Sequence, residues 1–199
     1  APLAERLGIG ETKGQLEDLA FPFAYPKEHS KVINTSEEFY INAQRRVVRM
    51  KKHLNKILTE IGIRNFDIQG RKKHLYSLWR KLERPGIDGN FEKVFDIMAL
   101  RILVPEITDC YAALGVLHKN YRPVPKWGIA DFIANPKPNG YRSIHSRVFD
   151  SGGFVAEVQI RTFEMHDQAE HGAAAHWAYS EIKNKGKKSK DKIKTNNIV

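Results

Sequence analysis

The sequence predicts an α+β fold in which a mixed β-sheet of about five strands is flanked by helices. Residues 94–104 form a near-continuous apolar run, which is typical of a central strand covered on both faces. Residues 143–149 and 154–161 are short strand patterns joined by a Ser-Gly-Gly turn, and they indicate a strand pair. Residues 35–61 carry apolar side chains at helical spacing and predict a long helix.

The first half of the chain supplies three further elements. Residues 3–25 contain leucines and phenylalanines broken by glycines, and we expect a helical segment that ends an upstream domain. Residues 35–38, Thr-Ser-Glu-Glu, fit a capping box that would begin the long helix. A short strand is expected over residues 66–70, and an amphipathic helix over residues 72–83 stops before Pro85.

The second half alternates helices and strands. Residues 108–120 predict a helix, residues 131–134 a short strand, and residues 136–140 a sharp Pro-Lys-Pro-Asn-Gly loop. Residues 163–179 predict a closing helix. The expected order is α-α-β-α-β-α-β-β-β-α, which describes a mixed sheet with helices packed on it.

Positive charge is concentrated in two stretches of this chain of 199 residues, whose net charge is +10. Residues 71–84 contribute +5 and residues 183–199 contribute +6, so the remaining residues sum to −1. Residues 183–199 have no apolar periodicity and predict a basic disordered tail or linker. We therefore expect a helical remnant over residues 1–34, the main domain over residues 35–182, and the tail.

Composition excludes several classes of protein. Hydrophobic residues make up 41% of the chain, which is enough for a core and excludes wholesale disorder. The single cysteine, Cys110, excludes a disulfide framework and a cysteine-cluster zinc site, and it indicates a reducing, cytoplasmic compartment. No run approaches the roughly 18 apolar residues of a membrane span. We expect neither a membrane nor DNA as a partner.

A carboxylate interrupts the expected central strand. Asp96 lies within the apolar run over residues 94–104. A buried carboxylate must be paired, protonated or bound to a metal. An ion pair with Arg101 is disfavoured, because odd spacing on a strand puts the two side chains on opposite faces.

The strand over residues 154–161 offers a second carboxylate. Glu157, Gln159 and Arg161 alternate with apolar residues, so their face is directed to water or to a ligand. For such a strand alone, an ordinary half-solvated surface is the more common explanation. Asp96 changes the balance, because Asp96 and Glu157 on neighbouring strands could together hold Mg²⁺.

The basic element has the composition of a phosphate-binding site. Lys73, Ser77 and Lys81 recur every four residues and would line one stripe of the helix over residues 72–83. Arg71 and Lys73 lie at the start of this helix, where backbone N–H groups favour anions. Together these side chains would cradle a triphosphate. A solvated basic face and an RNA-binding face are the alternatives.

The loop over residues 136–140 leads into a strand and carries an aromatic side chain at its end. Lys137, Asn139 and Tyr141 lie on or beside this stiff turn, and an exposed aromatic ring there could stack on a nucleobase. His145 follows on the same strand face. The alternative is a hairpin turn with a packing tyrosine.

The histidines of the closing helix do not fit a metal motif. His166, Glu170 and His171 follow the pattern H-x-x-x-E-H, which is one residue too long for the metal motif H-x-x-E-H. Hydrogen bonding along one helix face is favoured over a metal site. A His/Asp phosphohydrolase would need further histidines upstream, and residues 1–28 contain none.

These residues, in this order, resemble the synthetase domain of the RelA/SpoT family, the bacterial enzymes that make the alarmones ppGpp and pppGpp. The resemblance covers about residues 1–185. It is carried by four stretches: GRKKHLYSLWRK from Gly70, FDIMALR from Phe95, ANPKPNGYRSIHS from Ala134 and EVQIRTFEMHDQAEHGAAAHWAY from Glu157. The opening residues look like the end of the family's hydrolase domain, so no alarmone hydrolysis is expected.

The resemblance implies a nucleotidyltransferase-like sheet and transfer of pyrophosphate from ATP to the 3′-hydroxyl of GDP or GTP, in the stringent response. It implies that Asp96 binds magnesium. It also implies that Glu157 binds or orients the metal site and accepts the proton of the 3′-hydroxyl. The residues implied for ATP are Arg71, Lys73, Ser77, Lys81, Gln159 and Arg161. The residues implied for GDP or GTP are Tyr141, which would stack on guanine, with Lys137, Asn139 and His145.

The stretch over residues 126–131 departs from the family. The family usually has a charged motif there, Arg-x-Lys-Asp or Glu-x-Asp-Asp, which is linked to metal use and acceptor preference. This chain has Lys-Trp-Gly-Ile-Ala-Asp, in which only Asp131 matches, and Arg142 replaces the usual glutamine. The choice between GDP and GTP is therefore not predicted. The ribosome and regulatory domains are possible partners in a full-length protein.

Two other functions are weighed against this one. A catalytically silent nucleotide- or RNA-binding module would use the same basic element, would bind with a steep salt dependence and would not need Asp96. A different nucleotidyltransferase would release pyrophosphate in place of AMP. The pairing of Asp96 with Glu157 argues against the silent module.

Overall fold

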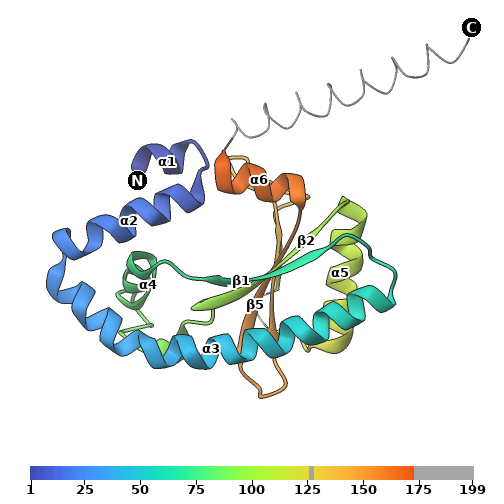
Figure 1. Ribbon diagram of the computed structural model, residues 1–199, viewed down its shortest axis with the longest axis horizontal. Coiled ribbons are helices and arrows are strands. Elements are labelled where there is room, and N and C mark those ends of the chain that lie inside the picture. Colours follow the sequence, from blue (N-terminus) through green and yellow to red (C-terminus); the bar gives the residue numbers. More distant parts are fainter. Residues whose placement is uncertain (126–127, 173–199) are drawn as a thin grey trace, which may run out of the picture.

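The computed structural model describes residues 1–125 and 128–172 (Figure 1). The expected tail and the end of the expected closing helix lie outside the described residues. Five strands form one sheet in the order β1-β2-β5-β4-β3. Their bounds are β1 Asp67–Lys72, β2 Met98–Val104, β3 Ile129–Asp131, β4 Ile144–Phe149 and β5 Val155–Thr162. Only β2 and β5 pair in parallel among these strands, which confirms the expected mixed sheet.

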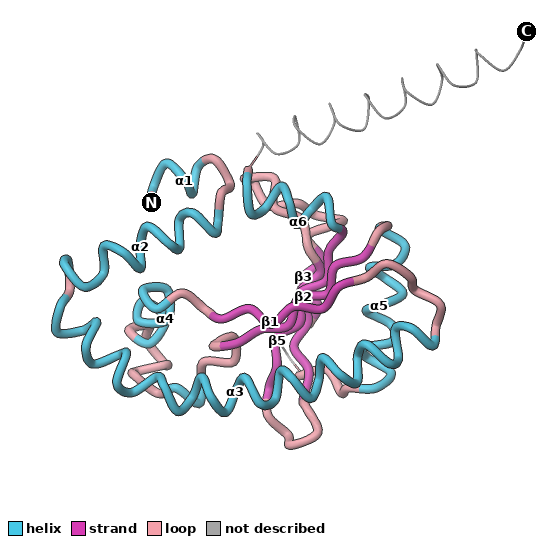
Figure 2. The backbone as a smooth tube through the Cα atoms, in the orientation of Figure 1, coloured by secondary structure: helices cyan, strands magenta, loops and turns pink. Residues whose placement is uncertain are grey.

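Six α-helices and one 3₁₀ turn surround the sheet in the described part of the chain. Their bounds are α1 Pro2–Arg6, α2 Gly10–Ala24, α3 Pro26–Glu60, α4 Leu75–Leu82, η1 Phe91–Lys93, α5 Ile107–Asn120 and α6 Phe163–His171. In Figures 1 and 2, α3 runs along one side of the molecule, while α1, α2 and α6 lie together on the opposite side. No helix in the described ranges combines the length and apolar character needed to span a bilayer.

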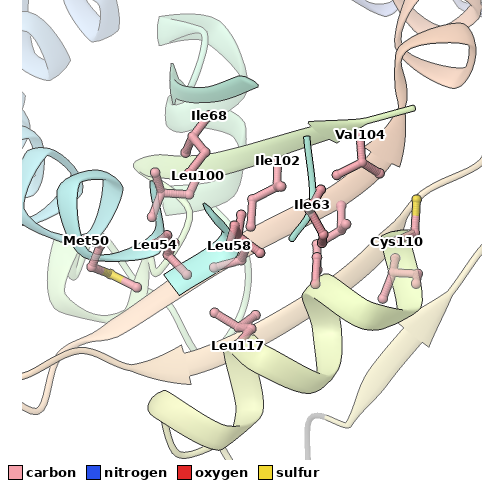
Figure 3. Packing of buried hydrophobic residues seen from close by; sticks show 14 of the residues in the cluster. Met50, Leu54, Leu58, Ile63, Ile68, Leu100, Ile102, Val104, Cys110 and Leu117 are labelled. Atoms are coloured by element: carbon pink, nitrogen blue, oxygen red, sulfur yellow. The ribbon is translucent and has the colours of Figure 1, made fainter. Parts of the chain in front are cut away.

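The main hydrophobic core lies between one face of the sheet and two helices. From α3 it takes residues such as Met50, Leu54 and Leu58, and from α5 it takes Leu117, all packed against central strand residues such as Ile102 (Figure 3). Leu54, Leu58, Ile102 and Leu117 are fully buried. Because apolar residues of β2 and β5 fill this face, the polar residues of the same strands are left to the other face.

A second hydrophobic cluster joins the N-terminal half of α3 to α2 and α4. Val32 and Tyr40 of α3 pack with Phe21 of α2 and with Leu78 and Trp79 of α4. The rings of Phe21 and Trp79 are stacked, with their centroids 5.2 Å apart. This cluster fixes α4, which carries part of the basic element, against the long helix.

The expected start of the long helix is wrong. The α3 helix begins at Pro26 and continues to Glu60, so the expected boundary between residues 34 and 35 falls within it. Ser36 is buried in the helix interior, where its hydroxyl donates to the carbonyl of Ile33. Proline is favoured in the first helical turn, and Val32 and Tyr40 extend the apolar stripe across the apparent capping box.

The expected boundaries around the basic element are also wrong. The chain remains a strand as far as Lys72, and α4 begins only at Leu75, because β1 pairs with β2 up to the Lys72 and Met98 pair. Arg71 is therefore a strand residue, and Lys73 lies between the strand and the helix. Asp96 precedes β2 and is not a strand residue.

The short strand near Asp131 is displaced toward the N-terminus. It covers Ile129–Asp131, and the residues after it form a turn. Asp131 Oδ1 accepts hydrogen bonds from the backbone N–H groups of Ile133 and Ala134, at 2.9 Å and 3.0 Å. These bonds fold the chain back and end the strand.

Candidate active site

Two lysines hold the carboxylate of Asp96. Lys81 Nζ lies 2.6 Å from Oδ1, and Lys73 Nζ lies 3.0 Å from Oδ2. Burial alone would raise the pKa of Asp96, but the two ammonium groups outweigh burial and hold the pKa below its ordinary value. Asp96 is thus ionised and paired, which is the first of the three outcomes expected for a buried carboxylate.

Lys73 is fixed through its backbone. Its N–H donates to the carbonyl of Ile97 at 3.0 Å, and its carbonyl accepts from the hydroxyl of Tyr40 at 2.9 Å. Lys73, Ser77 and Lys81 do not form one helical stripe, because Lys73 precedes α4. The structure nevertheless brings Lys73 and Lys81 onto the same carboxylate, while Ser77 lies half-buried between them in sequence.

Glu157 is held by neighbours on its own strand and on β4. Its side chain is buried, and Arg147 lies directly opposite in the strand register. Arg147 Nη2 approaches Glu157 Oε2 at 3.2 Å, and Gln159 Nε2 donates to Oε1 at 3.2 Å. Glu157, Gln159 and Arg161 are 7%, 5% and 1% exposed. This strand face is therefore polar but buried, which excludes the half-solvated surface and leaves a face directed to a ligand as the remaining expectation.

His145 connects Glu157 with the loop tyrosine. Its Nε2 lies 2.9 Å from the hydroxyl of Tyr141, and its Nδ1 lies 3.7 Å from Glu157 Oε1. Burial lowers the pKa of His145 to about 4, so its imidazole is neutral at neutral pH. Lys137 Nζ stands 5.2 Å from the ring centroid of Tyr141. Asn139 is exposed and accepts the backbone N–H of Tyr141 at 3.2 Å.

A buried charge cluster joins β2, β5 and α6. Glu170 Oε1 lies 3.1 Å from Arg101 Nη2 and 2.8 Å from Arg161 Nη2. Arg161 Nη2 also lies 2.6 Å from His166 Nδ1. Sequence reasoning found the pairing of His166 with Glu170 on one helix face, but it missed Arg101. The signal was present, because Arg101 and Arg161 are both strand residues on the polar face.

The polar face opens into two cavities that share Arg71, Arg101 and Glu11. One cavity, of about 220 Å³, is also lined by Asn139, Tyr141, Arg161 and Glu170. The other, of about 900 Å³, extends along Lys73 and His74 toward α3. Several buried polar atoms here have no hydrogen-bond partner among the described residues: Nε of Arg71, Arg101 and Arg161, and Oε1 of Gln159. Buried polar atoms without a partner are uncommon in folded proteins, so they mark this face as a candidate site.

The α2 helix closes one side of the larger cavity. Asp18 Oδ2 lies 2.9 Å from His74 Nδ1, and Asp18 Oδ1 accepts the backbone N–H of Tyr76 at 2.9 Å. A Cβ atom added to Gly14 would overlap the His74 ring, so only glycine permits this approach. The α2 helix therefore packs against His74, the residue that follows Lys73 in the chain.

We expect the contact between Asp18 and His74 to depend on pH. The hydrogen bond to Asp18 outweighs burial and raises the pKa of His74 above its ordinary value. The resulting stabilisation is complete below pH 6.5 and is lost as pH rises through the raised pKa. Asp18→Asn should therefore lower the free energy of unfolding by roughly 1 kcal/mol at pH 6 and by less at pH 8. Urea unfolding measures this, with Glu17→Gln as the control; equal losses at both pH values would contradict it.

The two candidate carboxylates fit Mg²⁺ in their chemistry. Carboxylate oxygens are preferred ligands, and magnesium is usually bound by one or two carboxylates together with substrate phosphates and water. The described residues contain no group of three or more metal-binding side chains, so substrate oxygens would have to complete any coordination sphere. Asp96 and Glu157 do not pair with each other, and each is held by basic or amide side chains.

Comparisons with known proteins identify the family of this chain. Residues 70–184 match the model of a region found in RelA and SpoT proteins. The chain is 44% identical over 181 residues to a GTP pyrophosphokinase of Photobacterium angustum, covering 91% of this chain and 24% of that protein. It is 46% identical over 187 residues to a guanosine-3′,5′-bis(diphosphate) 3′-pyrophosphohydrolase of Aquifex aeolicus, covering 92% and 26%. The chain thus spans about a quarter of the length of these relatives.

Solved structures share the fold. A GTP pyrophosphokinase family protein from Streptococcus pneumoniae is 25% identical with a TM-score of 0.54, over 78% of this chain and 93% of that one. The small alarmone synthetase 1 from Bacillus subtilis, solved with its product pppGpp, has a TM-score of 0.58 at 24% identity, over 83% and 99%. Because the family model matches more than half of the sequence and the mixed sheet is shared, the chain belongs to the RelA/SpoT family.

Proposed function

We propose that this chain is a (p)ppGpp synthetase, which transfers the β,γ-pyrophosphate of ATP to the 3′-hydroxyl of GDP or GTP. The observation that carries the proposal is the polar sheet face, where Glu157, Gln159 and Arg161 are buried on one strand and Arg161 also lines a cavity together with Arg71 and Arg101. Relatives named as GTP pyrophosphokinases support it. The synthetase domain expected over residues 35–182 and the end of a hydrolase-type domain expected over residues 1–34 would share the α3 helix. The protein would act in the cytoplasm, and a ribosome or regulatory domains would be partners of a longer protein.

The ATP phosphates would be bound by the basic side chains around Asp96. Lys73 and Lys81 already form ion pairs with the carboxylate of Asp96. An ATP phosphate bound at the same place would offer these ammonium groups more negative charge. Mg²⁺ held by Asp96 and Glu157 would supply charge neutralisation for the transferred group. The other side chains proposed for ATP are Arg71, Ser77, Gln159 and Arg161.

The acceptor nucleotide would lie at the loop side of the polar face. Tyr141 would stack on the guanine, with Lys137, Asn139 and His145 around the nucleotide. The 3′-oxygen would attack the β-phosphorus of ATP while the bond from that phosphorus to the α,β-bridging oxygen breaks. AMP leaves, and Glu157 accepts the proton of the 3′-hydroxyl. Such transfer is mostly positioning and charge neutralisation, which suits a site rich in arginine and lysine.

Incubation of the chain with ATP, MgCl₂ and either GDP or GTP tests this proposal. We expect AMP together with ppGpp or pppGpp in equal amounts, resolved by anion-exchange chromatography. Release of pyrophosphate in place of AMP would indicate another nucleotidyltransferase. Binding of RNA with a steep salt dependence and no AMP above background would indicate a silent binding module. Parallel reactions with GDP and GTP also measure the acceptor preference.

A further inference from the structure

Arg147 and Glu157 form a cross-strand pair, and Arg147 has no role in the proposed reaction. They are direct partners in the antiparallel register of β4 and β5. Side chains of directly opposed residues lie on the same face of a sheet, close enough to interact. The Glu157 side chain is 9% exposed and that of Arg147 is 34% exposed. The arginine therefore reaches a buried carboxylate from the rim of the polar face.

The contact is made to one oxygen of the carboxylate. Arg147 Nε lies 3.3 Å and Nη2 lies 3.2 Å from Glu157 Oε2. The other oxygen, Oε1, accepts from Gln159 Nε2 at 3.2 Å and lies 3.7 Å from His145 Nδ1. Arg147 Nε donates to Oε2 and Nη2 lies within ion-pair distance of the same oxygen, while Gln159 holds Oε1, so both carboxylate oxygens are fixed. Oε1 is thereby directed toward His145, which contacts Tyr141 through its other nitrogen.

Arg147 carries the permanent charge among the described side chains that contact this carboxylate. Gln159 is an amide, and the nearest ring nitrogen of His145 lies 3.7 Å from the carboxylate, beyond hydrogen-bond distance. A buried carboxylate that is held only by neutral donors is costly and free to adopt other rotamers. The arginine therefore supplies both the counter-charge and the orientation of Glu157.

We propose that Arg147 is a positioning residue for pyrophosphate transfer, which acts by holding Glu157 so that Oε1 faces the 3′-hydroxyl of the acceptor nucleotide. This inference rests on the proposed function. Arg147 does not touch the reacting atoms in this arrangement. Its loss should change the rate of the chemical step more than the binding of either nucleotide, because the phosphate and guanine contacts belong to other side chains.

Kinetics of Arg147→Met and Arg147→Lys provide the first test. We expect Arg147→Met to lower kcat about 10- to 100-fold, since a misplacement of the order of 1 Å costs about that much. The KM for ATP, measured by kinetics, and the Kd for GDP, measured by calorimetry, should each stay within about threefold of the wild-type value. Arg147→Lys should restore part of kcat, because lysine returns the positive charge but not the planar guanidinium group. Arg122→Met is the matched control, because Arg122 stacks on Phe149 at 4.7 Å and has no proposed role.

A double-mutant cycle decides whether Arg147 acts through Glu157. In a Glu157→Gln background, Arg147→Met should lower kcat no further, since the group it positions is absent. An equal loss of kcat in both backgrounds would overturn the inference, as would a kcat for Arg147→Met equal to that of Arg122→Met. An active wild-type protein with either result rejects the role of Arg147 alone. A wild-type protein that forms no AMP rejects the proposed function, and this inference falls with it. Thermal unfolding of each variant verifies that it is folded.

Discussion

Replacement of Glu157 with glutamine is expected to lower the rate of AMP formation by about 10²- to 10⁴-fold, which is the usual contribution of a positioned proton acceptor. Glutamine has nearly the same shape, so the contacts of Glu157 Oε1 with Gln159 and His145 can be kept. The change removes the negative charge and one acceptor oxygen. The measurement is kcat with GDP or GTP as acceptor, at saturating ATP and Mg²⁺.

The binding of GDP separates a chemical role of Glu157 from a structural one. The Kd for GDP should change by no more than about threefold in Glu157→Gln, because Tyr141, Lys137 and Asn139 are proposed to hold the acceptor. Glu60→Gln, at the exposed end of α3, is the matched control and should keep full activity. Activity of Glu157→Gln within about twofold of wild type would contradict the role given to this carboxylate.

The largest effect on stability is expected from Glu170→Ala. Glu170 contacts both Arg101 of β2 and Arg161 of β5, and both arginines are buried. Its removal leaves two buried cations that repel each other, and breaking such a buried pair usually costs about 3–5 kcal/mol. The side chain of Glu170 is 16% exposed and lines a cavity, so we expect a value at the lower end of this range, about 3 kcal/mol. The midpoint of urea unfolding should fall with an unchanged slope.

A surface ion pair offers the control for this measurement. Lys56 and Glu60 are 3.8 Å apart and both are exposed, so Glu60→Ala should cost less than roughly 0.5 kcal/mol. If Glu170→Ala lowers the free energy of unfolding no more than Glu60→Ala does, the charges of Arg101 and Arg161 are compensated by other groups, and the prediction is wrong. A double variant with Arg101→Met should be more stable than Glu170→Ala alone, because it removes one of the two uncompensated charges.

The strands could be predicted where side-chain alternation and turn chemistry agreed. The pattern around Ser151, Gly152 and Gly153 predicted the β4–β5 pair to within a few residues, and the apolar run predicted β2 as the central strand. Both signals are local and depend on which face of a strand is buried. The polar face of β5 was also predicted, although its burial was not, because burial depends on helices distant in sequence.

Other features depend on contacts that no local pattern contains. The apparent capping box at residues 35–38 is overridden by a helix that begins at Pro26 and packs through Tyr40. Lys73 contacts Asp96 because the antiparallel pairing of β1 with β2 ends at Lys72 and Met98. Both Lys73 and Asp96 therefore lie just beyond the paired strands. Sequence reasoning rejected Arg101 as the partner of Asp96 on the premise that both lie on one strand. That premise is wrong, because Asp96 precedes the strand, and the partners of Asp96 are Lys73 and Lys81.

The α3 helix runs through both hydrophobic clusters of the protein. Its N-terminal half holds the backbone of Lys73 through Tyr40, and its C-terminal half carries Met50 and Leu54 in the main core. A helix of 35 residues is about 52 Å long. One continuous element thus connects the lysine-bound carboxylate of Asp96 with the core under the sheet. The position of Lys73 would therefore be set when the protein folds, and nucleotide binding would not have to create it.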